Sequence, residues 1–447
     1  MDMIATNKVT AIVGMGVTGR SVARYLSSQG EAFVWLDTRE QPPALQDILQ
    51  EYPNLNYELG ELNPETLCAV KEIVLSPGIC PELPALLQAR EEGVSLVGDI
   101  ELFLRQVTEP VIAITGSNAK STVTTLVGEM AKAAGKQVGV GGNIGVPVLD
   151  LLEQPNDLYV LELSSFQLET IDNLGAAVAT VLNVSEDHMD RYDSLMHYHR
   201  AKQKIYFGAK KVVVNRADPL TNPPLAEGVE RLSFGLNAPD RHGFGLLNKG
   251  GQEWLAFEFK ALMPASEVRM PGRHSLDNAL AALALGHAAG LEMQPMLDTL
   301  KAFKGLPHRC EWVAEANGIN YYNDSKGTNV GATLAALNGL AKASGKIVLI
   351  AGGVGKGADF SGLRGPLQQC RGLVLIGEDA GLIEAAVSGA VPIVHGVDMA
   401  DAVVKAQAMA QVDDDILLSP ACASFDMFSG FEARGEAFVA AVREAIS

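Results

Sequence analysis

Three times along the chain, a short apolar run ends in a glycine-rich turn that leads into an amphipathic segment. The apolar runs are Val9–Val13, Val111–Ile114 and Lys346–Ile350. Each has the length of a buried strand, and strands that alternate with helices form mostly parallel α/β sheets. A chain of 447 residues has room for about three domains. The sequence therefore predicts an α/β protein with three domains, each built around one of these units.

The spacing of the units places the domain boundaries near residues 98 and 305. We expect an N-terminal domain over residues 1–98, a central domain over 99–305 and a C-terminal domain over 306–447. Gly305 and Pro307 mark the second boundary, because both residue types interrupt regular structure. The outer domains should be Rossmann-like, and the central domain should be of the P-loop ATPase type with a mostly parallel sheet.

The composition is that of a folded, acidic chain, with 47% hydrophobic residues, 20% charged residues and a net charge of −18. That charge argues against nucleic acid or an anionic membrane as a partner. The five cysteines lack the spacing of zinc sites or disulfide frameworks, which suits a reducing compartment. The start of the sequence has no signal-peptide pattern, and the longest apolar helix is too short for a bilayer. We expect a cytoplasmic monomer without membrane insertion.

The second glycine turn has the residues of a phosphate-binding loop and reads Thr115-Gly-Ser-Asn-Ala-Lys-Ser-Thr122. Backbone N–H groups at the start of a helix attract an anion. Lys120 would neutralise the β- and γ-phosphates, and the hydroxyl of Ser121 would help to hold Mg²⁺. The strict P-loop pattern has glycine where this chain has Ile114 and Ala119. A turn with an exposed lysine is therefore the alternative.

The first glycine turn, Gly14-Met-Gly-Val-Thr-Gly19, matches a dinucleotide fingerprint, and Asp37 follows the next apolar run. An acidic residue about 20 positions beyond such a turn binds ribose hydroxyls in NAD enzymes. Alone, this pattern favours NAD, with a UDP-sugar or a ligand-free turn as alternatives. The third turn carries Lys356 without a following Ser or Thr. It is interpreted as an anion-binding loop of lower phosphate specificity, or as a glycine turn with a surface lysine.

Polar side chains follow the expected strands of the central domain. Glu162 ends an apolar run, where a Walker-B-type carboxylate binds Mg²⁺, although a capped strand end explains it too. His188 lies in the polar run Asn183–Arg191 after another strand. Lys202 lies in an expected helix over residues 195–207, among aromatic and aliphatic neighbours. Its spacing alone favours a lysine whose stem packs and whose amine reaches water.

Together these motifs resemble those of the Mur ligases, essentially from end to end. The likeness is carried by Gly14–Gly19, Thr115–Ser121, Gly142–Gly145, Glu162–Glu169, Asp187–Tyr192, Asn323–Lys326, Gly353–Asp359 and Ser419–Ser424. The shorter spacing of the lysine loop is usual in that family. Ala119 stands where the family has glycine, and Val354 stands where an aspartate is expected.

The resemblance implies an ATP-dependent, ADP-forming ligase of cytoplasmic peptidoglycan precursor synthesis. It would join D-glutamate to UDP-N-acetylmuramoyl-L-alanine through an acyl-phosphate. The first glycine turn would then bind the UDP-sugar instead of NAD. Two Mg²⁺ ions and a carbamate on Lys202 would take part.

The resemblance also assigns the site residues. The UDP-sugar would contact Gly14, Thr18, Asp37, Thr38, Ser76, Pro77, Gly78 and Asn143. ATP would contact Gly116, Ser117, Asn118, Ala119, Lys120, Ser121, Thr122, Asn278, Arg309 and Asp324. The incoming amino acid would contact Thr328, Lys356, Ser424 and Phe431. Lys120, His188 and Lys202 would be catalytic, and the metal ligands would be Ser121, Glu162, His188 and the Lys202 carbamate.

Other functions account for parts of the sequence. An NAD-dependent oxidoreductase explains the first turn but leaves Lys120 and Glu162 without a role. A GTP switch would use Asn215–Asp218, which imitates a guanine-reading motif. Another Mur-type ligase or a folylpolyglutamate-type ligase would perform the same chemistry on another substrate.

Overall fold

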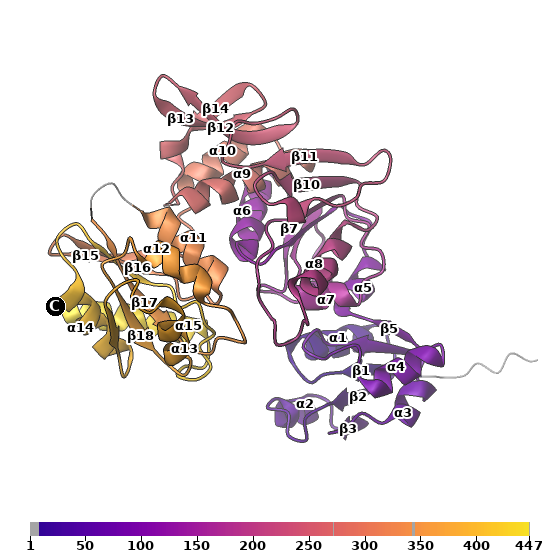
Figure 1. The fold of residues 1–447 in the computed structure, drawn as a ribbon. Coiled ribbons are helices and arrows are strands. Elements are labelled where there is room, and N and C mark those ends of the chain that lie inside the picture. Colours follow the sequence, from indigo (N-terminus) through magenta and orange to yellow (C-terminus); the bar gives the residue numbers. More distant parts are fainter. Residues whose placement is uncertain (1–8, 271, 342–344, 447) are drawn as a thin grey trace, which may run out of the picture.

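The computed structural model describes residues 9–270, 272–341 and 345–446 and forms three α/β domains, each around its own sheet (Figure 1). The N-terminal sheet has five parallel strands in the order β3-β2-β1-β4-β5. Its strands are β1 (Thr10–Val13), β2 (Phe33–Asp37), β3 (Tyr57–Leu59), β4 (Glu72–Leu75) and β5 (Ser95–Val97). Its helices are α1 (Val17–Ser28), α2 (Leu45–Glu51), α3 (Pro64–Ala69) and α4 (Pro84–Glu91). Because β1 lies between β2 and β4, the loops that follow these strands meet at one edge.

The central domain has a nine-stranded sheet in the order β14-β13-β12-β11-β10-β9-β6-β8-β7. Its strands are β6 (Val111–Thr115), β7 (Val138–Gly142), β8 (Leu158–Glu162), β9 (Val178–Val181), β10 (Lys211–Asn215), β11 (Glu230–Phe234), β12 (Gly243–Lys249), β13 (Gln252–Phe257) and β14 (Lys260–Pro264). Its helices are α5 (Asp99–Leu104), α6 (Lys120–Ala133), α7 (Ser165–Glu169), α8 (Leu195–Gln203), α9 (Arg273–Ala288) and α10 (Met293–Ala302). Only the pairs β12–β13 and β13–β14 of this described sheet are antiparallel. The mostly parallel central sheet is therefore confirmed.

The C-terminal domain has six strands in the order β15-β16-β20-β17-β18-β19. The strands are β15 (Glu311–Ala316), β16 (Ile319–Asn323), β17 (Ile347–Gly352), β18 (Gly372–Ile376), β19 (Ile393–His395) and β20 (Asp415–Leu418). The helices are α11 (Val330–Leu340), α12 (Arg364–Leu367), α13 (Ala380–Val387), α14 (Met399–Met409) and α15 (Phe431–Ile446). Helix α11 lies on the side of this domain that faces the central domain, where it contacts α9 (Figure 1).

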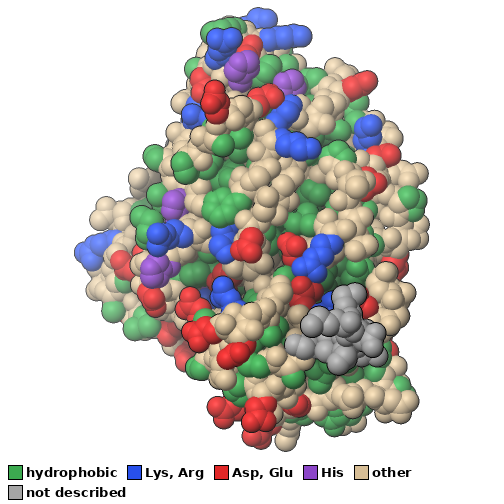
Figure 2. All heavy atoms as spheres, turned by 90° about the vertical axis from the view of Figure 1, so that its right-hand side faces the viewer, with side chains coloured by type: hydrophobic (Ala, Val, Ile, Leu, Met, Phe, Trp, Pro, Cys, Tyr) green, Lys and Arg blue, Asp and Glu red, His purple; other side chains and the backbone are tan. Residues whose placement is uncertain are grey.

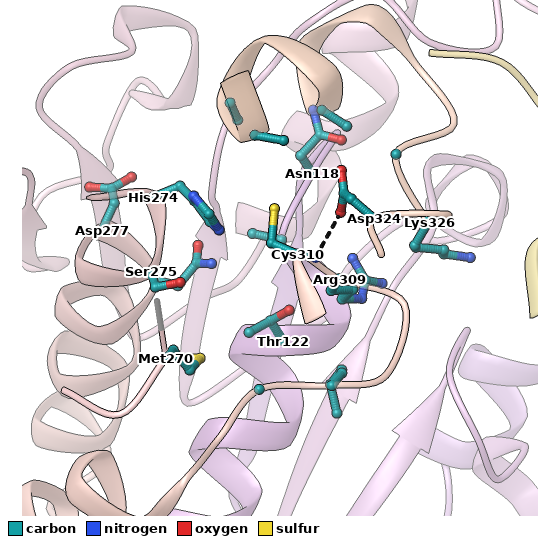
Figure 3. A pocket seen from close by; sticks show the side chains of 18 of the residues that line it. Asn118, Thr122, Met270, His274, Ser275, Asp277, Arg309, Cys310, Asp324 and Lys326 are labelled. Carbon is teal, nitrogen blue, oxygen red and sulfur yellow. Dashed lines mark hydrogen bonds between the residues drawn. The ribbon is translucent and has the colours of Figure 1, made fainter. Parts of the chain in front are cut away.

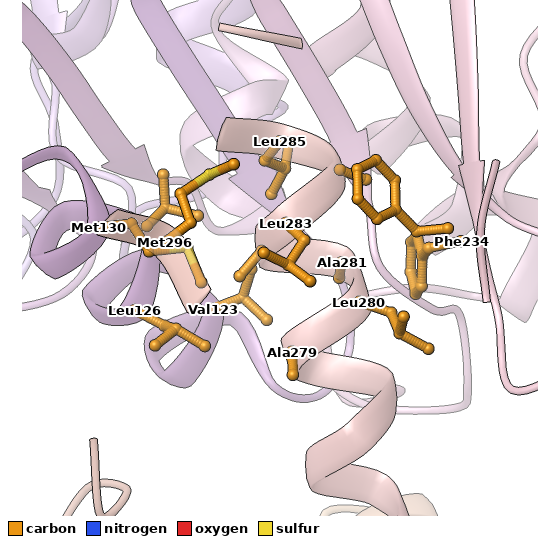
Figure 4. Close-up of a cluster of buried hydrophobic side chains, with 14 of the residues drawn as sticks. Val123, Leu126, Met130, Phe234, Ala279, Leu280, Ala281, Leu283, Leu285 and Met296 are labelled. Atoms are coloured by element: carbon orange, nitrogen blue, oxygen red, sulfur yellow. The ribbon is translucent and has the colours of Figure 1, made fainter. Parts of the chain in front are cut away.

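The core of the central domain forms around α9, which is buried on nearly every side. Residues Ala279–Leu285 of this helix are all buried. Figure 4 shows them between Phe234 of β11 on one side and Val123 and Met130 of α6 on the other. Apolar side chains around the whole circumference are what a helix between a sheet and other helices requires. This packing fixes α6, and therefore the phosphate loop at its start, against the sheet.

The surface reflects the acidic composition. On the face that Figure 2 presents, acidic side chains gather at the lower end, which belongs to the N-terminal domain. Among the described residues, no helix combines the length and the apolar character needed to cross a bilayer.

Candidate functional site

A cavity of about 290 Å³ opens between the central and C-terminal domains. Its central-domain wall consists of the phosphate loop and residues at or after the ends of β7, β8 and β9: Ser117, Asn118, Ala119, Lys120, Ser121, Asn143, Glu162, Asp187 and His188. The C-terminal wall includes Thr328, Asn329, Lys356, Ser424 and Phe431. The four residues predicted for the amino acid thus lie in one cavity with most of the phosphate loop and with three of the four predicted metal ligands, Ser121, Glu162 and His188.

The phosphate loop connects β6 to α6 and folds around its own lysine. Lys120 Nζ donates hydrogen bonds to the carbonyl oxygens of Gly116 at 2.8 Å and Ser117 at 3.0 Å. Burial lowers the pKa of Lys120, while Glu162 acts in the opposite direction. Ala119 has φ of 67°, a left-handed conformation that glycine adopts more readily than alanine. The backbone at Ala119 therefore has a conformation that favours glycine, and the Cβ of alanine is strained there.

Glu162 and His188 provide the best candidates for metal ligands. Glu162 is 2% exposed, and its Oε1 accepts a hydrogen bond from Asn143 Nδ2 at 2.8 Å. Its Oε2 is buried and has no hydrogen-bond partner among the described residues, as expected of a carboxylate oxygen that serves as a cation ligand. Burial lowers the pKa of His188, although the neighbouring Asp187 raises it, and a neutral imidazole is the form that binds metals.

In the described part of the chain, no three His, Cys, Asp or Glu side chains converge as a metal cluster. Glu162 and His188 would therefore need further ligands of another kind. The Ser121 hydroxyl lines the same cavity, but it already accepts a hydrogen bond from Arg309 Nη2 at 2.7 Å.

Lys202 of α8 does not reach water. It is 1% exposed, its Nζ donates to the carbonyl of Gly116 at 2.9 Å, and it lies 4.4 Å from the centre of the Tyr198 ring. The interpretation as a lysine with a solvent-exposed amine is therefore wrong, because α8 turns this side chain inward beneath the phosphate loop. Burial, followed by repulsion from Lys120, lowers its pKa well below the usual value. Burial therefore favours the uncharged form of an amine that lies next to the phosphate loop.

A second cavity of about 180 Å³ lies beside the first, between α9 and α11 (Figure 3). Predicted ATP residues line it: Asn118, Ala119, Thr122, Asn278, Arg309 and Asp324. Asn118, Ala119 and Arg309 border both cavities, so the two spaces adjoin. Asp324 accepts hydrogen bonds from Cys310 N at 3.1 Å and Ser419 Oγ at 2.7 Å, and burial raises its pKa to about 7.

The predicted UDP-sugar residues of the N-terminal domain lie apart from both cavities, at the carboxyl ends of β1, β2 and β4 or shortly after them. The loops of Gly14 and Ser76 pack so closely that a Cβ on Gly14 would lie 2.5 Å from Ser76 Oγ. Thr18 lies in the first turn of α1, while Thr38 follows β2 and Pro77 and Gly78 follow β4, and Thr38 and Gly78 are exposed.

Two members of the predicted UDP-sugar set have other contacts in the structure. Asp37 is 1% exposed, and its Oδ2 accepts hydrogen bonds from Met15 N and Arg39 Nη2, both at 2.7 Å. Its carboxylate therefore shapes the glycine turn. Asn143, predicted with this group, lies in the 290 Å³ cavity beside Glu162 instead.

Sequence reasoning missed several residues of the site. Asp187 and Asn329 line the 290 Å³ cavity, yet the sequence assigned a role to neither. Arg434, 1% exposed, donates hydrogen bonds to the carbonyls of Cys422 and Ala423 and so supports the loop that carries Ser424. Asp187 could have been found as the acid next to His188, but Arg434 sits in a helix with no sequence signal of its role.

The comparison with known proteins assigns the chain to a family. A UDP-N-acetylmuramoylalanine–D-glutamate ligase of Pseudomonas aeruginosa is 56% identical over 446 residues, which cover 99% of this chain and 100% of that protein. The chain belongs to the Mur ligase family. Family models for the Mur ligase MurD-like N-terminal domain, the Mur ligase middle domain and the Mur ligase glutamate ligase domain match residues 8–98, 114–286 and 308–422. A ligase of the same name from Marinobacter nauticus is 51% identical and covers 98% of both chains.

Solved structures share the fold. A MurF ligase from Thermotoga maritima in complex with ADP has a TM-score of 0.62 at 16% identity, with 98% of this chain and 96% of that chain covered. A pseudomurein peptide ligase type C from Methanothermus fervidus has a TM-score of 0.62 at 17% identity and covers 98% of this chain and 100% of that chain. The predicted three-domain α/β architecture and the resemblance to Mur ligases are confirmed.

Proposed function

We propose that this Mur ligase joins D-glutamate to UDP-N-acetylmuramoyl-L-alanine and converts ATP to ADP and phosphate. One observation carries the proposal: the phosphate loop, an unpartnered buried carboxylate oxygen and the C-terminal Lys356 meet in a single cavity. Relatives that carry the name of this ligase, at 51% and 56% identity over nearly the whole chain, support the choice of substrates. The oxidoreductase and GTP-switch alternatives explain neither this cavity nor these relatives.

The two cavities and the N-terminal loops suggest where each substrate binds. The nucleoside of ATP occupies the 180 Å³ cavity beside Asn278 and Asp324, with its phosphates on the Lys120 loop. The UDP group lies on the N-terminal glycine turn, whose shape Asp37 maintains. The acidic end of the sugar nucleotide then extends to Asn143 at the edge of the 290 Å³ cavity.

Lys120 performs the main electrostatic task in the first step. A carboxylate that attacks the γ-phosphate must overcome the repulsion between two anions, and a positioned ammonium offsets it. The Lys120 ammonium rests on the carbonyls of Gly116 and Ser117, from which it can turn to a phosphate. Glu162, His188 and the Ser121 hydroxyl would hold one Mg²⁺, a carbamate on Lys202 would serve as a ligand for a second, and the ions would supply Lewis-acid stabilisation.

The C-terminal residues bind and orient the second substrate. The Lys356 ammonium and the hydroxyls of Thr328 and Ser424 bind the carboxylates of D-glutamate, and Phe431 lines the wall beside them. The amine of D-glutamate displaces phosphate from the acyl-phosphate formed in the first step. Because the reacting groups come from different domains, correct placement of the C-terminal domain is part of catalysis.

An assay of phosphate release tests this function directly. Release should require ATP, Mg²⁺, UDP-N-acetylmuramoyl-L-alanine and D-glutamate together, and L-glutamate should be a poor substitute. Equal turnover with L-glutamate, or turnover that needs a folate instead of the sugar nucleotide, would contradict the proposal. The monomeric state and the cytoplasmic location stay predictions, which light scattering and cell fractionation would test.

A further inference from the structure

Asp187 connects two domains through a pair of hydrogen bonds. It belongs to the loop after β9 of the central domain, and both of its partners belong to the C-terminal domain. Its Oδ1 accepts from Lys356 Nζ at 2.8 Å, and its Oδ2 accepts from Asn329 Nδ2 at 3.1 Å. We call Asp187, Asn329 and Lys356 the Asp187 junction.

The junction extends to the phosphate loop. Asn329 Nδ2 also donates to Asn118 Oδ1 at 3.2 Å, while its own Oδ1 caps α11 by accepting from Ala332 N at 2.8 Å. Gly331, in the first turn of α11, approaches the central domain so closely that a Cβ there would lie 2.7 Å from Ser185 Oγ. The start of α11 thus packs against the loop that follows β9 and against the phosphate loop.

The chemistry of the junction requires both domains to be in place. The side chains of Asp187 and Lys356 are only 10% and 21% exposed. Lys356 Nζ lies 2.8 Å from Asp187 Oδ1, so its ammonium compensates the charge of the carboxylate. If the domains separated, Asp187 and Lys356 would each lose the opposite charge that compensates it. Water would then have to solvate both groups.

Lys356 keeps donor capacity for a ligand. An ammonium group has three N–H donors, and Asp187 is the one acceptor of Lys356 Nζ in the described structure, so two donors can face a substrate carboxylate. A long lysine side chain in open water samples many rotamers, and an ion pair at its tip restricts them. The contact therefore aims Lys356 into the 290 Å³ cavity that it lines.

We propose that Asp187 is a positioning residue that holds the C-terminal domain against the central domain and orients Lys356 toward the amino-acid substrate. The part that concerns the substrate rests on the proposed function, whereas the part that concerns the domains does not. Through Asn329 and Asn118, the same residue ties the placement of the C-terminal domain to the loop that binds phosphate.

The first test is Asp187→Asn, with Asp193→Asn as the matched control. The two contacts use different oxygens of Asp187, and the amide replaces one of them with an NH₂ donor and removes the negative charge, so one contact and the pairing of charge with Lys356 are lost. Asp193 lies in the same loop but is 91% exposed and pairs only with the exposed His197 in the described structure. Small-angle X-ray scattering of the unliganded proteins should show a larger radius of gyration for Asp187→Asn than for wild type and for the control.

Steady-state kinetics provide the second readout. Asp187→Asn should raise the KM for D-glutamate about tenfold, or about 1.4 kcal/mol, with the KM for the sugar nucleotide nearly unchanged. Gly331→Ala, which separates the same surfaces sterically, should also enlarge the radius of gyration, and melting curves would confirm that both variants are folded. If folded Asp187→Asn has the radius of gyration of wild type, Asp187 does not hold the two domains together. This outcome counts against the proposal whatever substrates the enzyme uses. An enlarged radius with an unchanged KM for D-glutamate overturns the orienting role of Asp187 toward Lys356.

Discussion

Lys202 provides the sharpest test of the proposed site, because its amine is buried beneath the phosphate loop and the proposed carbamate depends on it. Lys202→Met keeps most of the side-chain volume and removes the amine. The lost hydrogen bond to the Gly116 carbonyl costs about 1 kcal/mol. Removal of a desolvated nitrogen between Lys120 and Tyr198 offsets part of that cost. We expect the stability of this variant to lie within about 1 kcal/mol of wild type.

Lys202→Ala should behave differently because it leaves a cavity. Truncation of a fully buried long side chain costs about 2–5 kcal/mol, so this variant should melt earlier but still fold. If Lys202 carries a carbamate that serves as an oxygen ligand, both variants should lose about 10³-fold in kcat, equivalent to about 4 kcal/mol. In Lys202→Ala, the vacated space beside Gly116 can admit a small carboxylic acid.

The assay is phosphate release by both variants with increasing acetate or propionate, and with sodium chloride at matched ionic strength. Acid-dependent recovery in Lys202→Ala but not in Lys202→Met, in which the space is filled, would support a missing carboxylate. Native-state ¹³CO₂ NMR of the wild-type enzyme should show the carbamate carbon. Near-normal turnover by Lys202→Met would refute the reasoning, since no carbamate can form on a thioether.

Three further predictions concern the loop and the core. Lys120→Met should lower kcat about 10³-fold while the melting temperature changes little, and near-normal kcat would show that the lysine only shapes the loop. Ala119→Gly should stabilise the protein by up to about 1 kcal/mol in denaturant titrations, because φ is 67° there, whereas a loss of stability would contradict a strained loop. Burial raises the pKa of Asp99 to about 6, so the native state retains a proton that the unfolded state loses above its pKa of 3.8. Stability should therefore fall as pH rises from about 4 to 6, and Asp99→Asn should melt higher than wild type at pH 8 but not at pH 4.

The order of elements could be predicted from sequence because apolar periodicity and glycine turns are local signals. Val111–Ile114 and Leu158–Leu161 are strands as expected, and both helices that follow the first two glycine turns exist. The ends of the elements were less accurate. Helix α1 begins at Val17, inside the glycine turn Gly14–Gly19, because Gly16 already serves as its N-cap. The expected α-helix over residues 195–207 ends at Gln203 and continues as a 3₁₀ turn, Lys204–Tyr206.

The direction of single side chains could not be predicted, since it depends on contacts far away in the sequence. The spacing of Lys202 suits a surface helix as well as a buried one, and only the contact with the phosphate loop, 86 positions earlier, decides between them. Asp37 matches the ribose-binding acid of a fingerprint, yet its carboxylate is bound by Met15 and Arg39. The pairing of Asp187 with Lys356 spans 169 positions and two domains, so no local pattern contains it.

The distribution of charge explains how so acidic a chain binds such anionic ligands. The net charge is −18, yet the 290 Å³ cavity is lined by Lys120, Arg309, Lys326 and Lys356. Glu162 and Asp187 are the only carboxylates among the residues that line it in the described structure. Burial is the largest influence on Lys120 and Lys326 and lowers the pKa of both, which means that their charges lack full compensation in the free protein. Phosphates and substrate carboxylates supply that compensation. The acidic exterior therefore repels anions in general, whereas the cationic side chains of the 290 Å³ cavity attract them.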